Sequence, residues 1–161
     1  NKDSIRFMML NRSNDAELDF DFEKIKEKTK DNPVFYVQYA YARINSISRT
    51  LKISLNDQIS INAKTFQPNE YEDKIIRKIF EWPKIVESAA NKLEPHKIPF
   101  YLYELSTLFH SYWSKGNEDS KFKLIQNGKI IKEDSLAFIY LIAVVIKNGM
   151  NILGVSLPEK M

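Results

Sequence analysis

The sequence predicts an all-α fold, and three observations lead to this prediction. At least four segments carry apolar residues three and four positions apart, which is the spacing of one helix face. Short polar stretches connect these segments, as in bundles where each helix buries one stripe. The 161 residues, 43% of them hydrophobic, are enough for a single core. We therefore expect a helical bundle, with a short β-hairpin or loop near residues 120–132.

The clearest helix start in the first third of the chain is Asn32-Pro33. An asparagine side chain can cap free backbone N–H groups, and a proline needs no N–H at the first helical position. The helix is expected to end near Ile53, and its apolar residues form one stripe: Val34, Val37, Ala40, Ile44, Ile47 and Leu51. A short helix over about 4–10 and a charged helix over about 21–30 are expected before it.

In the middle of the chain, Asn69 and Glu72 have the spacing of a capping box, with asparagine in place of the usual serine or threonine. The helix that follows is predicted to bury Ile75, Ile76, Ile79 and Phe80. A proline inside a helix removes a hydrogen bond and clashes with the preceding turn. Pro83 is therefore expected to break this helix, and a separate helix is expected to run to about Leu93.

The last third is expected to begin with a helix that starts at Pro95. Its apolar stripe consists of Leu102, Leu105, Leu108, Phe109 and Tyr112. Gly116 is placed to end it. Asn127-Gly128 lies between two short apolar runs and predicts a hairpin turn, with an irregular loop as the alternative. Asp134 is expected to cap a final helix that stops near Gly149.

Composition excludes several classes of function. The chain has no cysteine, which rules out disulfides and cysteine-based metal sites and fits a reducing compartment. Its two histidines and four scattered glycines form neither a metal-binding nor a phosphate-binding motif. The net charge of +3 permits nucleic-acid contact without requiring it. The apolar run Leu136–Ile146 is shorter than the roughly 20 residues that span a bilayer, so we expect a buried helix and no membrane partner.

One surface of the Pro33 helix has the chemistry of a binding face. Tyr36, Tyr39 and Arg43 follow one another at intervals of three and four residues, so they share that surface. Aromatic rings beside a guanidinium suit unstacked bases and phosphate. The alternative is that the tyrosines rim the core and the arginine is a solvated charge.

The segment Asn32-Pro-Val-Phe-Tyr-Val-Gln-Tyr-Ala-Tyr-Ala-Arg43 resembles a signature of the helical anticodon-binding domain of arginyl-tRNA synthetases. Further blocks follow in the order of that family: Asp3–Leu10, Arg12–Asp21, Glu94–Lys97, Tyr101–Leu105, Phe109–Tyr112 and Gly149–Met161. The resemblance thus covers nearly the whole chain. It implies that residues 1–31 close a catalytic-domain region and link it to a helical anticodon-binding domain at residues 32–161.

The resemblance implies a parent polypeptide that joins arginine to its tRNA using ATP, while this part holds the anticodon stem-loop. The nucleotide-binding signatures His-Ile-Gly-His and Lys-Met-Ser-Lys-Ser are missing here, and the chain begins without methionine. We expect a non-catalytic piece with no catalytic residue, metal or cofactor of its own. Its implied partners are arginine tRNA and the catalytic and amino-terminal domains of the parent, in a cytoplasmic monomer.

Site residues are carried over from the family one by one. Tyr39 and Arg43 are implied to touch the anticodon, and Tyr112 and Met161 to line a pocket for its middle base. The loop that ends at Asn32 is implied to meet the anticodon backbone, and Tyr36 shares the aromatic face. Alternatives remain for Tyr39, Tyr112 and Met161. Tyr39 and Tyr112 could instead pack in the core, as could Trp113 beside Tyr112. Met161 lies in a carboxyl-terminal tail, which can fray.

Two rival interpretations stay open at this level. One is the anticodon domain of a different class I synthetase, such as the cysteinyl enzyme, although the carboxyl-terminal block favours arginine. The other is a non-enzymatic helical module for protein–protein interaction, in which the tyrosine face binds a peptide or a partner helix. Salt-sensitive binding that depends on anticodon sequence would separate RNA recognition from the second rival.

Overall fold

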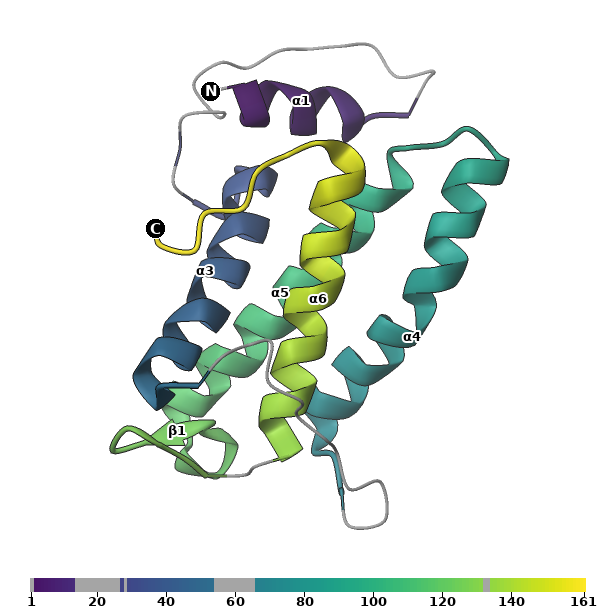
Figure 1. Cartoon of the computed structure of the whole chain (residues 1–161). Helices are drawn as coiled ribbons and strands as arrows, with labels where there is room; N and C mark the ends of the chain where they lie inside the picture. Colours follow the sequence, from purple (N-terminus) through teal and green to yellow (C-terminus); the bar gives the residue numbers. More distant parts are fainter. Residues whose placement is uncertain (1, 14–26, 28, 54–65, 132–133) are drawn as a thin grey trace.

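The computed structural model describes residues 2–13, 27, 29–53, 66–131 and 134–161. Within this part the chain is an all-α bundle, as predicted, of five helices: α1 (Lys2–Leu10), α3 (Pro33–Leu51), α4 (Glu70–Asn91), α5 (Lys97–Glu118) and α6 (Asp134–Leu153) (Figure 1). A 3₁₀ turn (Ser120–Phe122) and a hairpin of β1 (Ile125–Gln126) and β2 (Lys129–Ile130) connect α5 to α6. Most of the predicted charged helix over 21–30 lies outside the described residues.

Helix α5 occupies the centre of the bundle and packs against α3, α4 and α6. Figure 1 shows α3 and α4 on opposite sides of α5 and α6, with α1 lying across one end of the bundle. The yellow carboxyl-terminal tail runs back along α3 (Figure 1). The largest fully buried side chains come from all five helices and include Phe7, Ile44, Ile75, Leu102, Phe109 and Phe138.

Helix α3 begins and ends much as its sequence predicts. The Asn32 side chain accepts a hydrogen bond from the Phe35 backbone N–H, and Pro33 takes the first helical position. The helix ends two residues before Ile53, because Lys52 adopts a left-handed conformation with φ of 54°. The predicted stripe is confirmed: Val34, Val37, Ala40, Ile44 and Ile47 are buried, and Leu51 packs partly against the core.

Helix α4 begins with the predicted capping box, but it is one helix instead of two. The Asn69 side chain accepts from the backbone of Glu72, whose carboxylate accepts from the Asn69 backbone at 2.9 Å. The predicted break at Pro83 is wrong, since the helix continues to Asn91. Pro83 lies on the exposed side of the helix, and the helix continues past it despite the hydrogen bond that a proline removes. Phe80, predicted to be buried, lies one turn earlier and is 80% exposed.

Gly116 and Gly149, predicted to end their helices, lie inside them because neighbouring segments come close. A Cβ atom at Gly149 would lie 2.7 Å from the buried Leu102 side chain, and one at Gly116 would lie 2.9 Å from the Phe122 carbonyl oxygen. Helix α6 instead ends before Gly154, whose φ of 65° favours glycine. Gly116 and Gly149 therefore allow close packing between segments, whereas Gly154 allows the backbone conformation that ends α6.

The predicted hairpin is confirmed. Ile125 pairs with Ile130 and Gln126 with Lys129 in antiparallel register. Asn127 and Gly128 both have positive φ, 52° and 70°, which is the type I′ conformation that asparagine and glycine favour.

Helix α6 is longer than the predicted apolar run. Over its 20 residues it is long and apolar enough to cross a membrane by length and composition. However, 56% of its most apolar window is buried inside the bundle, where Phe138, Ile142 and Ile146 are fully enclosed. Its expected place as a buried helix is therefore confirmed, and the helix extends beyond both ends of the predicted apolar run.

A buried polar network joins three helices around the Glu72 carboxylate. The Tyr112 hydroxyl of α5 donates to Glu72 Oε1 at 3.0 Å, and the Ser135 hydroxyl of α6 donates to the same oxygen at 2.9 Å. Glu72 is fully buried. A buried carboxylate is tolerated only where donors satisfy it, so these contacts fix how α4, α5 and α6 meet.

The structure predicts that Glu72→Ala destabilises the fold by about 2–4 kcal/mol, because it removes the cap and leaves the Tyr112 and Ser135 hydroxyls without their acceptor. The exposed Glu70→Ala, in the same helical turn, should cost under about 0.5 kcal/mol. Urea unfolding monitored by circular dichroism measures both. Equal midpoints for the two variants would contradict a structural role of this network.

Candidate nucleic-acid interface

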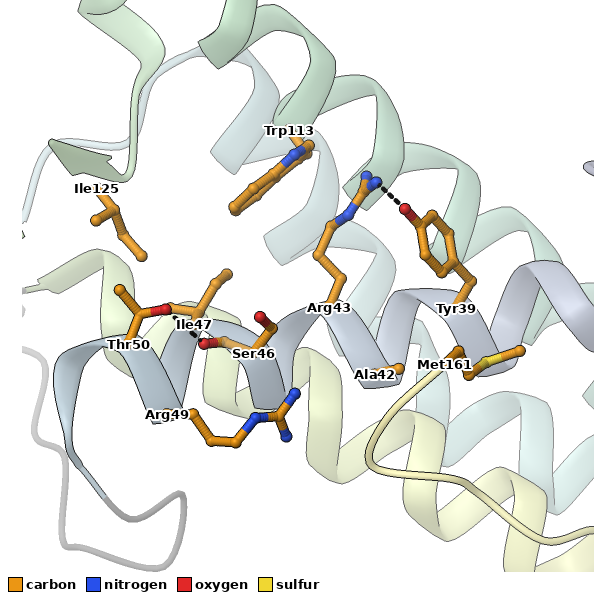
Figure 2. Close-up of a pocket in the computed structure, with 10 residues that line it drawn as sticks. All are labelled: Tyr39, Ala42, Arg43, Ser46, Ile47, Arg49, Thr50, Trp113, Ile125 and Met161. Atoms are coloured by element: carbon orange, nitrogen blue, oxygen red, sulfur yellow. Dashed lines mark hydrogen bonds between the residues drawn. The ribbon is translucent and has the colours of Figure 1, made fainter. Parts of the chain in front are cut away.

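A pocket of about 490 Å³ opens between α3, the carboxyl-terminal part of α5, strand β1 and the carboxyl-terminal tail (Figure 2). Its lining combines two aromatic rings, two guanidinium groups, hydroxyls and apolar side chains: Tyr39, Ala42, Arg43, Ser46, Ile47, Arg49, Thr50, Trp113, Ile125 and Met161. No carboxylate side chain lines it among the described residues. The charged side chains of the described lining are therefore both arginines, and they lie beside two aromatic rings.

Arg43 extends from α3 into the space between Trp113 and Tyr39 (Figure 2). Its Nη2 donates to the Tyr39 hydroxyl at 2.7 Å, and its guanidinium carbon lies 4.5 Å from the centre of the Tyr39 ring and 5.2 Å from that of Trp113. In the described part of the chain, no carboxylate forms an ion pair with Arg43. Its positive charge therefore stays available to an anionic ligand.

His110 lies behind Arg43 and is 6% exposed. Its Nδ1 lies 3.3 Å from Arg43 Nη1, and its Nε2 lies 3.1 Å from the Tyr36 carbonyl oxygen. The pKa of His110 is lowered from its ordinary 6.5 to about 4, chiefly by burial; the bond to the Tyr36 carbonyl raises it and the Arg43 charge lowers it. The imidazole is therefore neutral at physiological pH.

The carboxyl-terminal tail is held along the bundle by side chains of α1 and α3. Gln38 Nε2 donates to the Ser156 carbonyl at 2.9 Å, and Arg49 Nη1 donates to the Glu159 carbonyl at 3.0 Å. Arg6 Nη1 donates to the Gly154 carbonyl at 2.9 Å, and the Ser156 hydroxyl donates to Asp3. These anchors bring Met161, which is 54% exposed, to the pocket rather than leaving the tail frayed.

The structure brings three of the predicted site residues together. Tyr39 and Arg43 of α3 and Met161 at the other end of the chain all line the pocket (Figure 2). Tyr39 and Arg43 lie one helical turn apart, as their spacing predicts.

The other three predicted residues lie elsewhere. Tyr112, expected to line the pocket, is 2% exposed and points into the core toward Glu72. Asn32 is 4% exposed because its side chain caps α3 and its amide donates to the Glu27 carbonyl. Tyr36 is partly buried beside His110, with ring centres 4.3 Å apart, and is not part of the lining.

The sequence interpretation did not identify Trp113 and Arg49 as pocket residues. Trp113 follows Tyr112 directly, and consecutive helical residues point about 100° apart, so one faces the core while the other faces the pocket. Periodicity gives spacing along a helix and leaves the rotation of that helix undetermined. Only the burial of Tyr112 against Glu72 decides between these neighbours.

The arrangement suits binding. Among the described residues, no group of three histidine, aspartate or glutamate side chains is placed to hold a metal ion. Two aromatic faces beside an arginine are the features that bind splayed bases of single-stranded nucleic acid. Fold and pocket together thus suit a class of protein, that of helical nucleic-acid-binding domains.

Comparison with known proteins narrows this class. Residues 37–161 match the DALR anticodon binding domain, so the chain belongs to this family. It is 53% identical over 160 residues to an arginine–tRNA ligase of Pelagibacter ubique and 41% identical over 170 residues to one of Rhizobium etli. Each match covers 99% of this chain but 28% of the relative, so the chain spans under a third of the curated relatives it matches.

A solved structure agrees in fold. The structure of a putative arginyl-tRNA synthetase from Campylobacter jejuni superimposes with a TM-score of 0.83 at 25% identity. The match covers 99% of this chain and 33% of that one.

The depressed pKa of His110 predicts a loss of stability in acid. The unfolded histidine takes up a proton near pH 6.5 and the folded one only near pH 4, so stability falls as pH drops between these values. The loss should reach at most about 3 kcal/mol. Urea unfolding of the unsubstituted chain and of His110→Gln from neutral pH to about pH 4 isolates this effect, because the stability advantage of the unsubstituted chain should shrink as pH falls. Parallel pH profiles would contradict it.

Proposed function

We propose that this chain is the anticodon-binding domain of an arginyl-tRNA synthetase and that its pocket takes an unstacked anticodon base. The observation that carries the proposal is the juxtaposition of Tyr39, Arg43 and Trp113 in a pocket whose described lining contains no aspartate or glutamate side chain. Family membership and the named relatives favour this function over a cysteinyl enzyme or a protein-interaction module.

Each pocket residue has a role in the proposal. The rings of Tyr39 and Trp113 offer faces on which a base can stack, and stacking contributes about 1–3 kcal/mol per base. Arg43 donates to a base edge or a phosphate. Met161 supplies a flexible apolar contact. Of the loop before α3, the exposed Lys30 suits the anticodon backbone, whereas Asn32 holds the helix start.

The proposal assigns catalysis to the rest of the parent polypeptide. That polypeptide would attach arginine to its tRNA using ATP, in the cytoplasm and as a monomer. Residues 1–31 would link the catalytic region to this domain. The hydrogen bond from Arg6 to the Gly154 carbonyl supports a link that moves together with the bundle.

The proposal is tested by the affinity of this chain for an arginine-tRNA anticodon stem-loop and for the same loop with a changed middle base, at fixed low salt. A preference for the native loop is expected, measured by fluorescence anisotropy. Equal, salt-sensitive binding of both loops would reduce the site to a phosphate-contacting surface. Absence of binding to either would contradict the proposal.

Arg43→Ala should weaken stem-loop binding by about 1–3 kcal/mol, or roughly 5- to 150-fold, since it removes a charge-assisted donor from a partly buried site. Arg77→Ala makes the same charge change on the exposed face of α4, where Arg77 pairs with Asp73. This control should bind nearly as the parent does. An equal loss for both variants would mean that net charge, and not the pocket, governs binding.

The neighbours Trp113 and Tyr112 should separate binding from stability. Trp113→Ala should cost about 1–3 kcal/mol of RNA binding through lost stacking. Tyr112→Phe keeps the buried ring and should leave RNA binding unchanged, but it should cost about 1–2 kcal/mol of folding stability because it removes the hydroxyl that bonds to Glu72. Anisotropy titrations and urea unfolding measure the two quantities. A binding loss confined to Tyr112→Phe would reverse this assignment.

Met161→Ala should reduce discrimination between the native and the changed middle base more than it reduces affinity for the native loop. The residue offers an adaptable apolar contact at the edge of the pocket rather than a charge. The measurement is the ratio of dissociation constants for the two loops. Equal weakening toward both loops would count against a role in base selection, and Lys160→Ala on the exposed tail serves as the neighbouring control.

A further inference from the structure

The hydrogen bonds of His110 define a single tautomer. Arginine carries N–H donors and no acceptor, so His110 Nδ1, 3.3 Å from Arg43 Nη1, must accept. The proton of the neutral ring then lies on Nε2, which donates to the Tyr36 carbonyl oxygen at 3.1 Å. One protonation state of the imidazole thus satisfies both contacts at once.

The His110 ring is also fixed by its surroundings. It packs against the Tyr36 ring at 4.3 Å and against the Tyr39 ring at 5.5 Å between centres, and Phe109 adjoins it at 5.8 Å. The residue is 6% exposed and is not part of the pocket lining. Burial keeps its pKa near 4, so it acts as an acceptor throughout the neutral range.

This acceptor determines what Arg43 can offer to a ligand. Of the five guanidinium N–H groups, one bonds to His110 and one to the Tyr39 hydroxyl, which leaves three without a partner among the described residues. Two bonds from separate helices hold the guanidinium plane in place. A side chain held in its binding geometry loses less conformational freedom when the ligand arrives.

We propose that His110 is a positioning residue for RNA recognition, which holds the Arg43 guanidinium between Tyr39 and Trp113 without touching the RNA. This role rests on the proposed function of the pocket. It places the acceptor that orients the arginine on α5, one turn before Trp113, so that α3 and α5 build the contact jointly.

Two substitutions at this position separate positioning from general structure. Asparagine places an amide oxygen near the site of Nδ1, and His110→Asn therefore keeps the acceptor for Arg43 while losing the ring and the bond to Tyr36. His110→Gln reaches the site of Nε2 and keeps only the bond to the Tyr36 carbonyl. Both variants lose the ring packing, so both should lose stability in urea unfolding.

Binding of the anticodon stem-loop should differ between them. His110→Gln is expected to weaken it about 3- to 10-fold, the loss of one oriented hydrogen bond, and His110→Asn by less than about 2-fold. In an Arg43→Ala background, His110→Gln should cause no further loss, because its effect acts through Arg43. Two results would overturn the positioning role: an equal loss of stem-loop affinity in His110→Gln and His110→Asn, or the same loss from His110→Gln when Arg43 is already alanine.

The tautomer provides a test that needs no variant. Nitrogen NMR of the parent chain at neutral pH should show a protonated Nε2 and an unprotonated Nδ1 for His110, and the reverse tautomer would overturn the proposal. Failure of the two proposals is distinguishable. If the unsubstituted chain binds neither stem-loop, both the proposed function and the positioning role of His110 fail. If the unsubstituted chain binds the stem-loop, and Arg43→Ala weakens this binding while His110→Gln does not, only the positioning role fails.

Discussion

The orientation of α5 depends on the burial of the Tyr112 side chain, whose hydroxyl donates to the buried Glu72 carboxylate. Burial raises the pKa of that hydroxyl, and so does the neighbouring Glu72 charge, which keeps it a donor. Because α5 turns about 100° per residue, fixing Tyr112 toward Glu72 directs Trp113 to the pocket. Two adjacent residues thus have different surroundings: Tyr112 is buried in the core, and Trp113 lines the pocket.

The pocket is a composite of elements that are far apart in the sequence. Helix α3 supplies Tyr39 and Arg43, α5 supplies Trp113, and the tail supplies Met161 after Gln38 and Arg49 anchor its backbone (Figure 2). None of these elements forms the pocket alone. Recognition by this domain is therefore coupled to the packing of α3 against α5, and loosening the core should weaken binding without any change in the pocket residues.

Local signals in the sequence predicted the elements better than their packing. Capping at Asn32 and Asn69 and the Asn127-Gly128 turn depend on neighbours in the chain, and all three formed as expected. The prediction that Gly149 ends a helix is wrong, because glycine is needed there to leave room for the Leu102 side chain of another helix. The site shows the same limit. The spacing of Tyr39 and Arg43 predicted that they share one face of α3. Spacing could not predict whether Tyr112 or Trp113 faces the pocket, because that depends on the contact of Tyr112 with Glu72 on another helix.

The most direct test of the account uses the two tryptophans of the chain as internal reporters. Trp113 lines the pocket, whereas Trp82 packs against Tyr101 between α4 and α5. Titrating a nitrogen-labelled chain with the arginine-tRNA anticodon stem-loop, with Trp82→Phe to assign the two indole N–H signals, should shift the Trp113 signal and leave that of Trp82 in place. Binding that shifts Trp82 alone, or neither signal, would contradict the claim that this pocket receives the anticodon.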